Sequence, residues 1–475
     1  YPFVFNNAPV DGSFGITSKL FLDQITTGGR LINSLEIPNS SQKGVPPTKD
    51  QMVTSFSSKS EVALNLSTDG SYLTFMGYLA PINALDVSNS NTPGVVDPTN
   101  PVGENVYRVV ALIDAKGKLR YTLTNAYSGN NGRAAILNNT DGANVVYTSG
   151  NAGNGANPQP DGVIIAAGAQ ILSPEVKSVV AQSPGLPTPV GSFNITQLGY
   201  KPDKIGKDTN FRGLRIFDNV IYYTKGSGGN GINTVYFVDT TGTACPSGGV
   251  GLPAPGATLP TSGLDYNPDP AVIQADGLVP YNMCVLTGFP TILAKSATLF
   301  PFGVWFANAT TVYVSDEGNG AVGNTVATFY DPAAAQTTAG LQKWIFNSSS
   351  GQWELAYTLT NGLNLGVPYI VPGYPTGLNS GTGGTGFPWA PATAGLRNIN
   401  GVVNGDGTAT IYAITSTVSG SGDQGADPNK LVVITDDVSA ATLPAAEKFT
   451  TLDSSRNGEV LRGVSFTPGT FTARK

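Results

Sequence analysis

Four of the chain's ten arginines occupy one position of a sequence pattern that recurs along the chain. The pattern is a short apolar strand, a turn built from Asp, Asn and Gly, and a second strand rich in Val and Tyr. The equivalent positions are Glu61, Arg133, Arg212, Phe302, Arg397 and Arg462. Guanidinium groups that converge from such a repeat would bind a carboxylate, sulfate or phosphate through paired hydrogen bonds, with Glu61 offsetting part of the charge.

The same arginines also have a structural interpretation. Each would pair with a backbone carbonyl or with a carboxylate of the neighbouring repeat and so hold the repeats together. We favour this interpretation, because like charges that converge without an anion repel one another. Trp389, in the Gly- and Pro-rich stretch 384–391, is a further candidate for ligand binding, as an exposed platform for a sugar ring.

The carboxylates are a second source of chemistry, because the chain contains no histidine. This excludes Ser-His-Asp and Cys-His catalysis, histidine metal sites and histidine proton shuttles. Asp316 and Glu317 are adjacent at the end of a strand, so they point in opposite directions and only one reaches a given site. Asp316, Asp423 and Asp427 are candidate Ca²⁺ ligands, although 420–429 lacks EF-hand spacing and ordinary turns are the default interpretation. We expect no other cofactor.

The repeats must position these side chains. The hairpin pattern occurs at 61–78, 133–150, 212–226, 302–318 and 397–415, with a truncated copy at 462. A second pair of strands follows several copies, as at 106–123 and 341–359, so each repeat is a four-stranded meander. Such sheets repeated around an axis predict an all-β fold, a single β-propeller that spans 1–475.

The ends of the chain complement each other. Residues 19–38 predict an outer pair of strands, and 460–468 predict an inner strand. Together they would form one closing blade, which gives six blades, with seven as the alternative.

A short stretch resembles a known family. Residues 312–319 (VYVSDEGN) resemble the YVAD-x-GN signature of NHL- and YVTN-type propellers, and 340–344 (GLQKW) looks like secreted bacterial propellers of that kind. The resemblance implies the propeller fold and a range of roles: binding scaffolds, interaction platforms and a minority of lyases and hydrolases.

Composition restricts the partners. Charged residues make up 12% of the chain, the net charge is −6 and no Lys/Arg cluster occurs, so nucleic acid and anionic membrane surfaces are excluded as partners. No run approaches the roughly 18 apolar residues that a membrane span needs. The first residue is Tyr rather than Met, so we expect a processed chain, although a trimmed chain would look the same.

The remaining signals predict a secreted glycoprotein. Cys245 and Cys284 flank a loop insertion, 240–280, that a disulfide would close, with two buried thiols as the alternative. The glycosylation sequons begin at Asn39, Asn65, Asn138, Asn194, Asn308 and Asn347. Those at Asn65, Asn138 and Asn308 fall at or near the repeated turn, where we expect exposure.

These observations predict a secreted, glycosylated propeller that acts as an extracellular binding or structural protein for a carbohydrate or small anionic ligand. The alternative is a lyase or hydrolase that uses carboxylates or Tyr on a polysaccharide or small metabolite. A third interpretation is self-assembly into a filament or sheet, through an apolar patch on one rim.

Overall fold

The protein is an all-β structure in the part of the chain that can be described. The structure, a computed structural model, describes residues 16–38, 52–56, 58–151, 168–174, 179–180, 189–191, 193, 195–200, 210–245, 249–264, 282–321, 339–374, 390–419 and 427–470. Within these ranges the elements are strands and three short 3₁₀ turns, η1 (Val87–Asn89), η3 (Ile195–Leu198) and η4 (Ala294–Ser296), and no α-helix occurs. The same ranges contain no helix with the length and hydropathy required to cross a membrane.

The repeated hairpins form the inner halves of antiparallel sheets. The first two sheets contain β5 (Asn65–Leu66), β6 (Tyr72–Tyr78), β7 (Arg108–Asp114) and β8 (Leu119–Thr124), then β9 (Gly132–Asn138), β10 (Val145–Gly150), β11 (Ala169–Leu172) and β13 (Pro189–Gly191). The third contains β14 (Leu214–Phe217), β15 (Val220–Lys225), β16 (Thr234–Val238) and β18 (Met283–Leu286). The last two contain β19 (Pro301–Asn308), β20 (Thr311–Asp316), β21 (Leu341–Asn347) and β22 (Gln352–Leu359), then β23 (Ala392–Val403), β24 (Thr408–Val418), β25 (Lys430–Asp437) and β26 (Thr450–Ser454). Two short strands add in parallel at outer edges, β12 (Val179–Val180) beside β8 and β17 (Val250–Gly251) beside β18.

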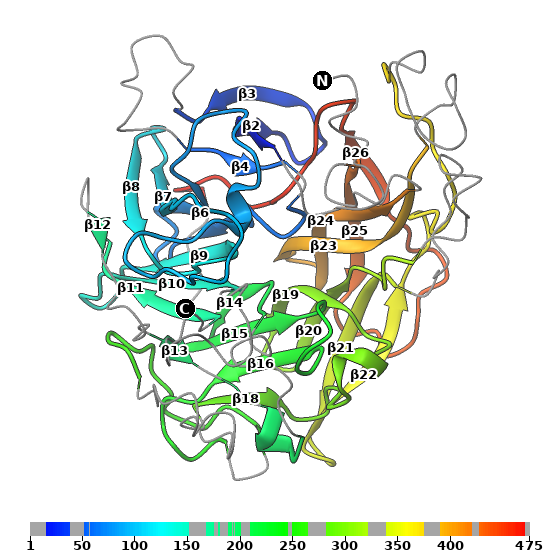
Figure 1. The fold of residues 1–475 in the computed structure, drawn as a ribbon. Helices are drawn as coiled ribbons and strands as arrows, with labels where there is room; N and C mark the ends of the chain where they lie inside the picture. Colours follow the sequence, from blue (N-terminus) through cyan, green and yellow to red (C-terminus); the bar gives the residue numbers. More distant parts are fainter. Residues whose placement is uncertain are drawn as a thin grey trace.

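Figure 1 shows the sheets arranged around a common centre. The first strands of four sheets, β9, β14, β19 and β23, lie near that centre, and strands such as β8, β18, β22 and β26 lie at the periphery. This is the arrangement of a β-propeller with four-stranded blades, so the predicted fold is confirmed. The predicted number of six blades is wrong, because the described residues form five such sheets.

The described segments near the two ends of the chain pack against the first and fifth sheets. The hairpin of β2 (Phe21–Ile25) and β3 (Leu31–Glu36) forms a separate two-stranded sheet, and a second small sheet pairs β1 (Thr17–Ser18) with β4 (Thr54–Ser55). Residues 461–467 form no strand, which is why a sixth sheet is absent among the described residues. The closing blade from 19–38 and 460–468, and the assignment of 1–475 to one domain, stay predictions.

The C-terminal segment nevertheless contacts both neighbouring sheets. Asn398 of β23 donates from Nδ2 to the carbonyl of Arg462 at 2.7 Å. A Cβ atom added to Gly463 would lie 2.4 Å from the carbonyl oxygen of Val62, so the two backbones touch. Ile25 of the N-terminal hairpin belongs to the same apolar cluster as Leu461, Val464 and Phe466. The axis is therefore surrounded by five sheets and one irregular segment.

The core lies between the sheets. Phe217 of β14 stacks on Phe306 of β19 at 4.7 Å, and Phe289, which follows β18, stacks on Trp344 of β21 at 4.1 Å. Both contacts join the third sheet to the fourth. Aromatic rings on strands thus act as wedges between blades, because alternate side chains of each strand face the neighbouring sheet.

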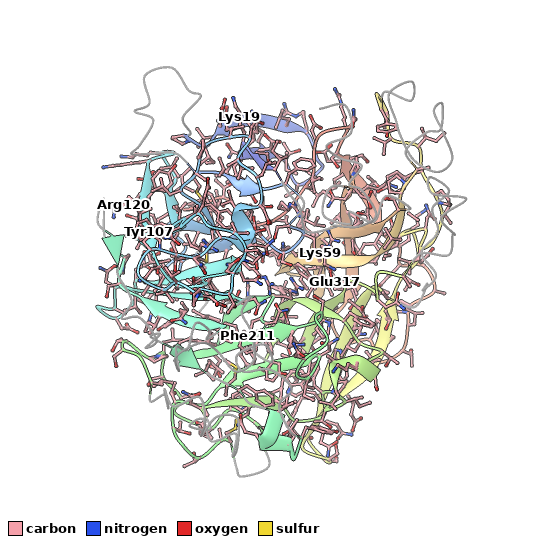
Figure 2. The ribbon with its side chains drawn as sticks, in the orientation of Figure 1. Lys19, Lys59, Tyr107, Arg120, Phe211 and Glu317 are labelled. Carbon is pink, nitrogen blue, oxygen red and sulfur yellow. A yellow bond between two sulfur atoms is a disulfide. The ribbon has the colours of Figure 1, made fainter. Side chains whose placement is uncertain are left out.

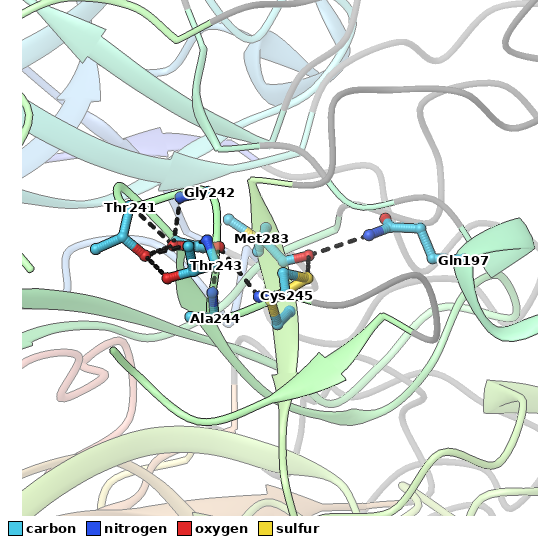
Figure 3. Close-up of a disulfide and its surroundings, with 9 residues drawn as sticks. Gln197, Thr241, Gly242, Thr243, Ala244, Cys245 and Met283 are labelled. Carbon is cyan, nitrogen blue, oxygen red and sulfur yellow. Dashed lines mark hydrogen bonds between the residues drawn. A yellow bond between two sulfur atoms is a disulfide. The ribbon is translucent and has the colours of Figure 1, made fainter. Parts of the chain in front are cut away.

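Cys245 and Cys284 form a disulfide, as the sequence predicts, with sulfurs 2.07 Å apart. It joins the segment after β16 to β18, and its surroundings are hydrogen-bonded (Figure 3): Gln197 donates to the carbonyl of Met283, and Asp239 accepts from the amides of Ala244 and Cys245. The bridge holds the base of the insertion against the outer part of the third blade.

Candidate functional site

The inner strands touch around the axis at the repeated arginine positions. A hydroxyl on the second strand of one blade donates to the inner-strand carbonyl of the next blade: Ser149 to Arg212 at 3.2 Å, Thr224 to Phe302 at 2.5 Å, and Ser315 to Arg397. Three of the positions that the sequence aligned, Arg212, Phe302 and Arg397, are therefore equivalent in space. Their side chains are held at one level because the backbone contacts repeat.

Glu317 is the acidic centre of this level. Its Oε2 lies 3.0 Å from Nζ of Lys59 and 3.6 Å from Nε of Arg397. Figure 2 shows Lys59 and Glu317 together near the centre of the molecule. Burial favours a higher pKa for Glu317, but the charges of Lys59, Arg212 and Arg397 outweigh burial and hold that pKa below its ordinary value.

The cations of the cluster are largely desolvated. Burial lowers the pKa of Arg212 and Arg397, and for Arg133 burial and the charge of Arg212 hold the pKa well below its usual value. Burial lowers the pKa of Lys59 to about 8 even though the charge of Glu317 opposes this shift. The side chain of Lys59 is still 24% exposed, so the cluster reaches solvent there.

Arg133, Arg212 and Arg462 have neutral hydrogen-bond partners. Arg133 donates to the carbonyl of Phe211 at 2.6 Å and to side-chain oxygens of Asn131 and Asn210. Arg212 donates to the hydroxyls of Ser60 and Ser227, while its buried Nε has no hydrogen-bond partner within the described ranges. Arg462 donates to the carbonyl of Phe56. These contacts fit the structural interpretation, and a ligand-binding role for the arginines stays a prediction.

Glu61 is engaged on the other side of the cluster. Its carboxylate accepts from the hydroxyl of Thr54 at 2.7 Å, from the amide of Ser55 at 3.0 Å and from the hydroxyl of Tyr78. Its charge also acts on Arg133. The hydrogen bonds of Glu61 are therefore made with the first blade and the segment before it, and its charge offsets only part of the arginine charge.

A cavity of about 20 Å³ lies on the axis next to this level. Its lining includes Gly213, Gly303, Arg215 and Asn398, and it has room for roughly one water molecule. Burial lowers the pKa of Arg215 to about 10. A whole sugar ring does not fit in this cavity.

Sequence reasoning missed Lys59 and the role of Glu317. Lys59 precedes the first repeat, so alignment of the repeats does not reveal it. The adjacent carboxylates Asp316 and Glu317 have different surroundings. Glu317 meets the cations, whereas Asp316 accepts from the amide of Gly318 at 2.8 Å and burial raises its pKa to about 6.

The other candidate residues lie apart from the cluster or outside the described ranges. Asp427 is buried and accepts from the hydroxyl of Ser419 at 2.7 Å, and its charge acts on Arg397. Trp389 and Asp423 lie outside the described residues. Among the residues that the structure describes, no group of three His, Cys, Asp or Glu side chains is placed to hold a metal ion. Calcium binding at Asp316, Asp423 or Asp427 stays a prediction.

The sequons differ in exposure. Asn65 and Asn138 are 9% and 3% exposed, and their Nδ2 atoms donate to the carbonyl of Ala135 and to the hydroxyl of Tyr147. The expectation that these two asparagines are exposed is therefore wrong, because they lie in the strands β5 and β9 rather than in the turns, and they pack against neighbouring strands. Asn308 is exposed and Asn347 is partly exposed. Asn39 and Asn194 lie outside the described residues.

No protein-family model and no curated protein matches the chain, so the NHL/YVTN resemblance gains no support beyond the propeller fold itself. Among solved structures, a "putative 6-phosphogluconolactonase" from Bacteroides uniformis is similar at 10% identity and a TM-score of 0.35, over 90% of this chain and 76% of that chain. A protein of unknown function from Dyadobacter fermentans is similar at 10% identity and a TM-score of 0.31, over 82% of this chain and 94% of that chain. Likenesses of this degree carry no functional argument.

Proposed function

We propose that this protein is an extracellular binding protein whose axial cluster receives the anionic group of a ligand. The observation that carries the proposal is that Lys59, Arg212 and Arg397 share one buried carboxylate, Glu317. A propeller fits a binding or structural role, since its loops and axis provide sites that are independent of the sheets.

The charge balance of the cluster supports an anion. The charges of four cationic side chains, Lys59, Arg133, Arg212 and Arg397, interact with that of Glu317. Glu61 acts on Arg133, and Asp427 acts on Arg397. Buried charge without a counter-charge is costly, so a site with excess positive charge gains from an added anion.

The cavity on the axis is too small for the anionic group and is not lined by Lys59. A carboxylate or sulfate would therefore meet Lys59, the exposed member of the cluster, from the solvent side. The rest of the ligand would remain in solvent above the axis. An acidic sugar carries a carboxylate on a neutral ring. It therefore meets this restriction and is also a carbohydrate, the class of ligand that the sequence predicts.

The test compares an acidic sugar with its neutral counterpart. We expect galacturonate or sulfate, but not galactose, to raise the thermal unfolding temperature and to bind in isothermal titration calorimetry. At 100 times the dissociation constant, linkage gives about 2.7 kcal/mol of stabilisation. Lys59→Gln should remove most of the effect, whereas Lys118→Gln, on an exposed turn, should retain it.

Equal responses to galacturonate and galactose, or no response to any of these ligands, would contradict the proposal. If Lys59→Gln responded to the ligand as strongly as the wild type does, the ligand would bind somewhere other than the axial cluster.

Secretion and glycosylation are part of the same proposal. The disulfide supports an oxidising compartment. After expression through a eukaryotic secretory pathway, peptide mass spectrometry should find glycans at Asn308 and Asn347 and none at Asn65 or Asn138, because a glycan cannot attach to a buried, hydrogen-bonded amide in this fold. Unmodified Asn308 and Asn347 would contradict this expectation.

A further inference from the structure

A buried lysine and a buried aspartate face each other between the fourth and fifth blades. Nζ of Lys343 on β21 lies 2.9 Å from Oδ2 of Asp436 on β25, and both side chains are fully buried. The pair is remote in sequence and joins two sheets that share no strand pairing. It takes no part in the axial cluster.

Two tyrosines and a glutamate complete the surroundings. The hydroxyls of Tyr313 and Tyr357 donate to Oδ2 and Oδ1 of Asp436, the latter at 2.7 Å. The aromatic ring of Tyr357 lies 5.1 Å from Nζ of Lys343. Oε1 of Glu447 accepts from the amide of Asp437 at 3.1 Å, which places this carboxyl group next to Asp436. Burial and the interaction with Asp436 raise the pKa of Glu447 to about 7.

We propose that Lys343 and Asp436 condense to an amide, a covalent cross-link between the fourth and fifth blades, with Glu447 transferring the protons. The arrangement provides a nucleophile, an acyl carbon, a hydrogen-bond donor on each oxygen of the Asp436 carboxylate and a carboxyl group that can exchange a proton. A simple ion pair between blades needs neither Glu447 beside Asp436 nor two tyrosines on the same carboxylate.

The reaction balances without a co-reactant. A proton passes from the Lys343 ammonium to Oδ2 of Asp436, 2.9 Å away, which gives a neutral amine and a carboxylic acid. The nitrogen attacks Cγ of Asp436. Oδ1 becomes the oxyanion, which the hydroxyl of Tyr357 stabilises, and Oδ2, which Tyr313 contacts, becomes the departing hydroxyl. Glu447 donates its proton to the departing hydroxyl and then takes a proton from the nitrogen. One C–N bond forms, one C–O bond breaks, and one water leaves.

The folded protein supplies the driving force that the free side chains lack. Cγ is bonded to Oδ2, which lies 2.9 Å from Nζ, so the two reacting groups are already in contact. Groups that a fold holds in this way react as if at effective concentrations on the order of 10⁵–10⁸ M. The backbone carbonyls of Asp437 and Ala440 hold Nζ in place, at 2.6 and 2.9 Å.

The test is the mass of the purified full chain. If the cross-link forms, the intact protein is lighter by one water than its sequence with the disulfide, after any glycans are removed. Tryptic mapping should then recover one joined peptide pair that contains 343 and 436, with no cleavage after Lys343. Recovery of separate peptides with Lys343 cleaved and Asp436 unmodified would overturn the proposal.

Variants assign the roles. Lys343→Arg keeps the positive charge but cannot form the amide, so its mass should match its sequence. Glu447→Gln keeps the shape and should slow cross-linking after refolding by about 10²–10⁴-fold, the usual contribution of acid-base catalysis. Glu459→Gln, near the C-terminus and away from this site, should cross-link normally. Unchanged kinetics in Glu447→Gln would overturn the role of Glu447, even if the cross-link itself is present.

Discussion

At the scale of single residues, Glu317 carries the negative charge that several cationic side chains near the axis share. Its carboxylate is almost fully buried and is contacted by Lys59 and Arg397, with Arg212 acting at longer range. Alignment of the repeats predicts that the arginines lie at one level around the axis, because equivalent positions in a repeat become equivalent positions in space. It could not supply Lys59, which lies outside the repeats, nor tell which of the adjacent Asp316 and Glu317 faces inward.

Glu317→Gln should destabilise the protein by about 3–5 kcal/mol, because it leaves several buried cations without their shared counter-charge. Since the folded-state pKa of Glu317 is lowered, its contribution is present above the unfolded pKa of about 4.3 and is lost as pH falls through the folded value. The gap between wild type and variant, measured by urea unfolding, should therefore shrink in acid. Glu104→Gln, at an exposed site, should match wild type at every pH, and an equal loss in both variants would refute the role of Glu317.

At the scale of elements, the inner strands approach each other closely enough to require glycine. Gly303 of β19 accepts no side chain, because an added Cβ would lie 2.8 Å from the carbonyl oxygen of Arg397 on β23. A register shift between Pro301 and Val304 also marks this point in the ladder. The sequence showed Gly after the repeated position at 213, 303 and 463, but the contact that requires it is between blades and cannot be read from one strand.

Gly303→Ala should therefore cost about 1–3 kcal/mol, the range for overpacking against backbone atoms. The matched control is Gly405→Ala, in the turn between β23 and β24, where an added Cβ meets no atom within 4 Å. The control should change stability by no more than about 0.5 kcal/mol. Comparable unfolding midpoints for the two variants would show that the inner strands can separate without cost.

At the scale of the whole molecule, the ring has five sheets and a gap that the C-terminal segment enters. Residues 461–466 contact Asn398 and Ile25 and approach the backbone of Val62, but they add no strand to a sheet. The sequence repeat at Arg462 predicts an inner strand there. The chain instead makes only side-chain and backbone contacts.

Deletion of 461–475 should lower stability by at least about 2 kcal/mol, because Leu461, Val464 and Phe466 leave the apolar cluster beside β24. Deletion of 471–475 alone is the control, and it should leave the unfolding curve unchanged. If both truncations unfold alike in urea, the segment does not contribute to closing the ring.

The sequence alone determined the strands, the turns of Asp, Asn and Gly, the propeller and the disulfide partners, because alternation, turn chemistry and a cysteine pair are local or countable features. The tertiary structure decided the number of sheets, the burial of Asn65 and Asn138, the gathering of cations on Glu317 and the meeting of Lys343 with Asp436. These depend on how sheets pack against one another, and packing brings together residues whose separation along the chain carries no signal.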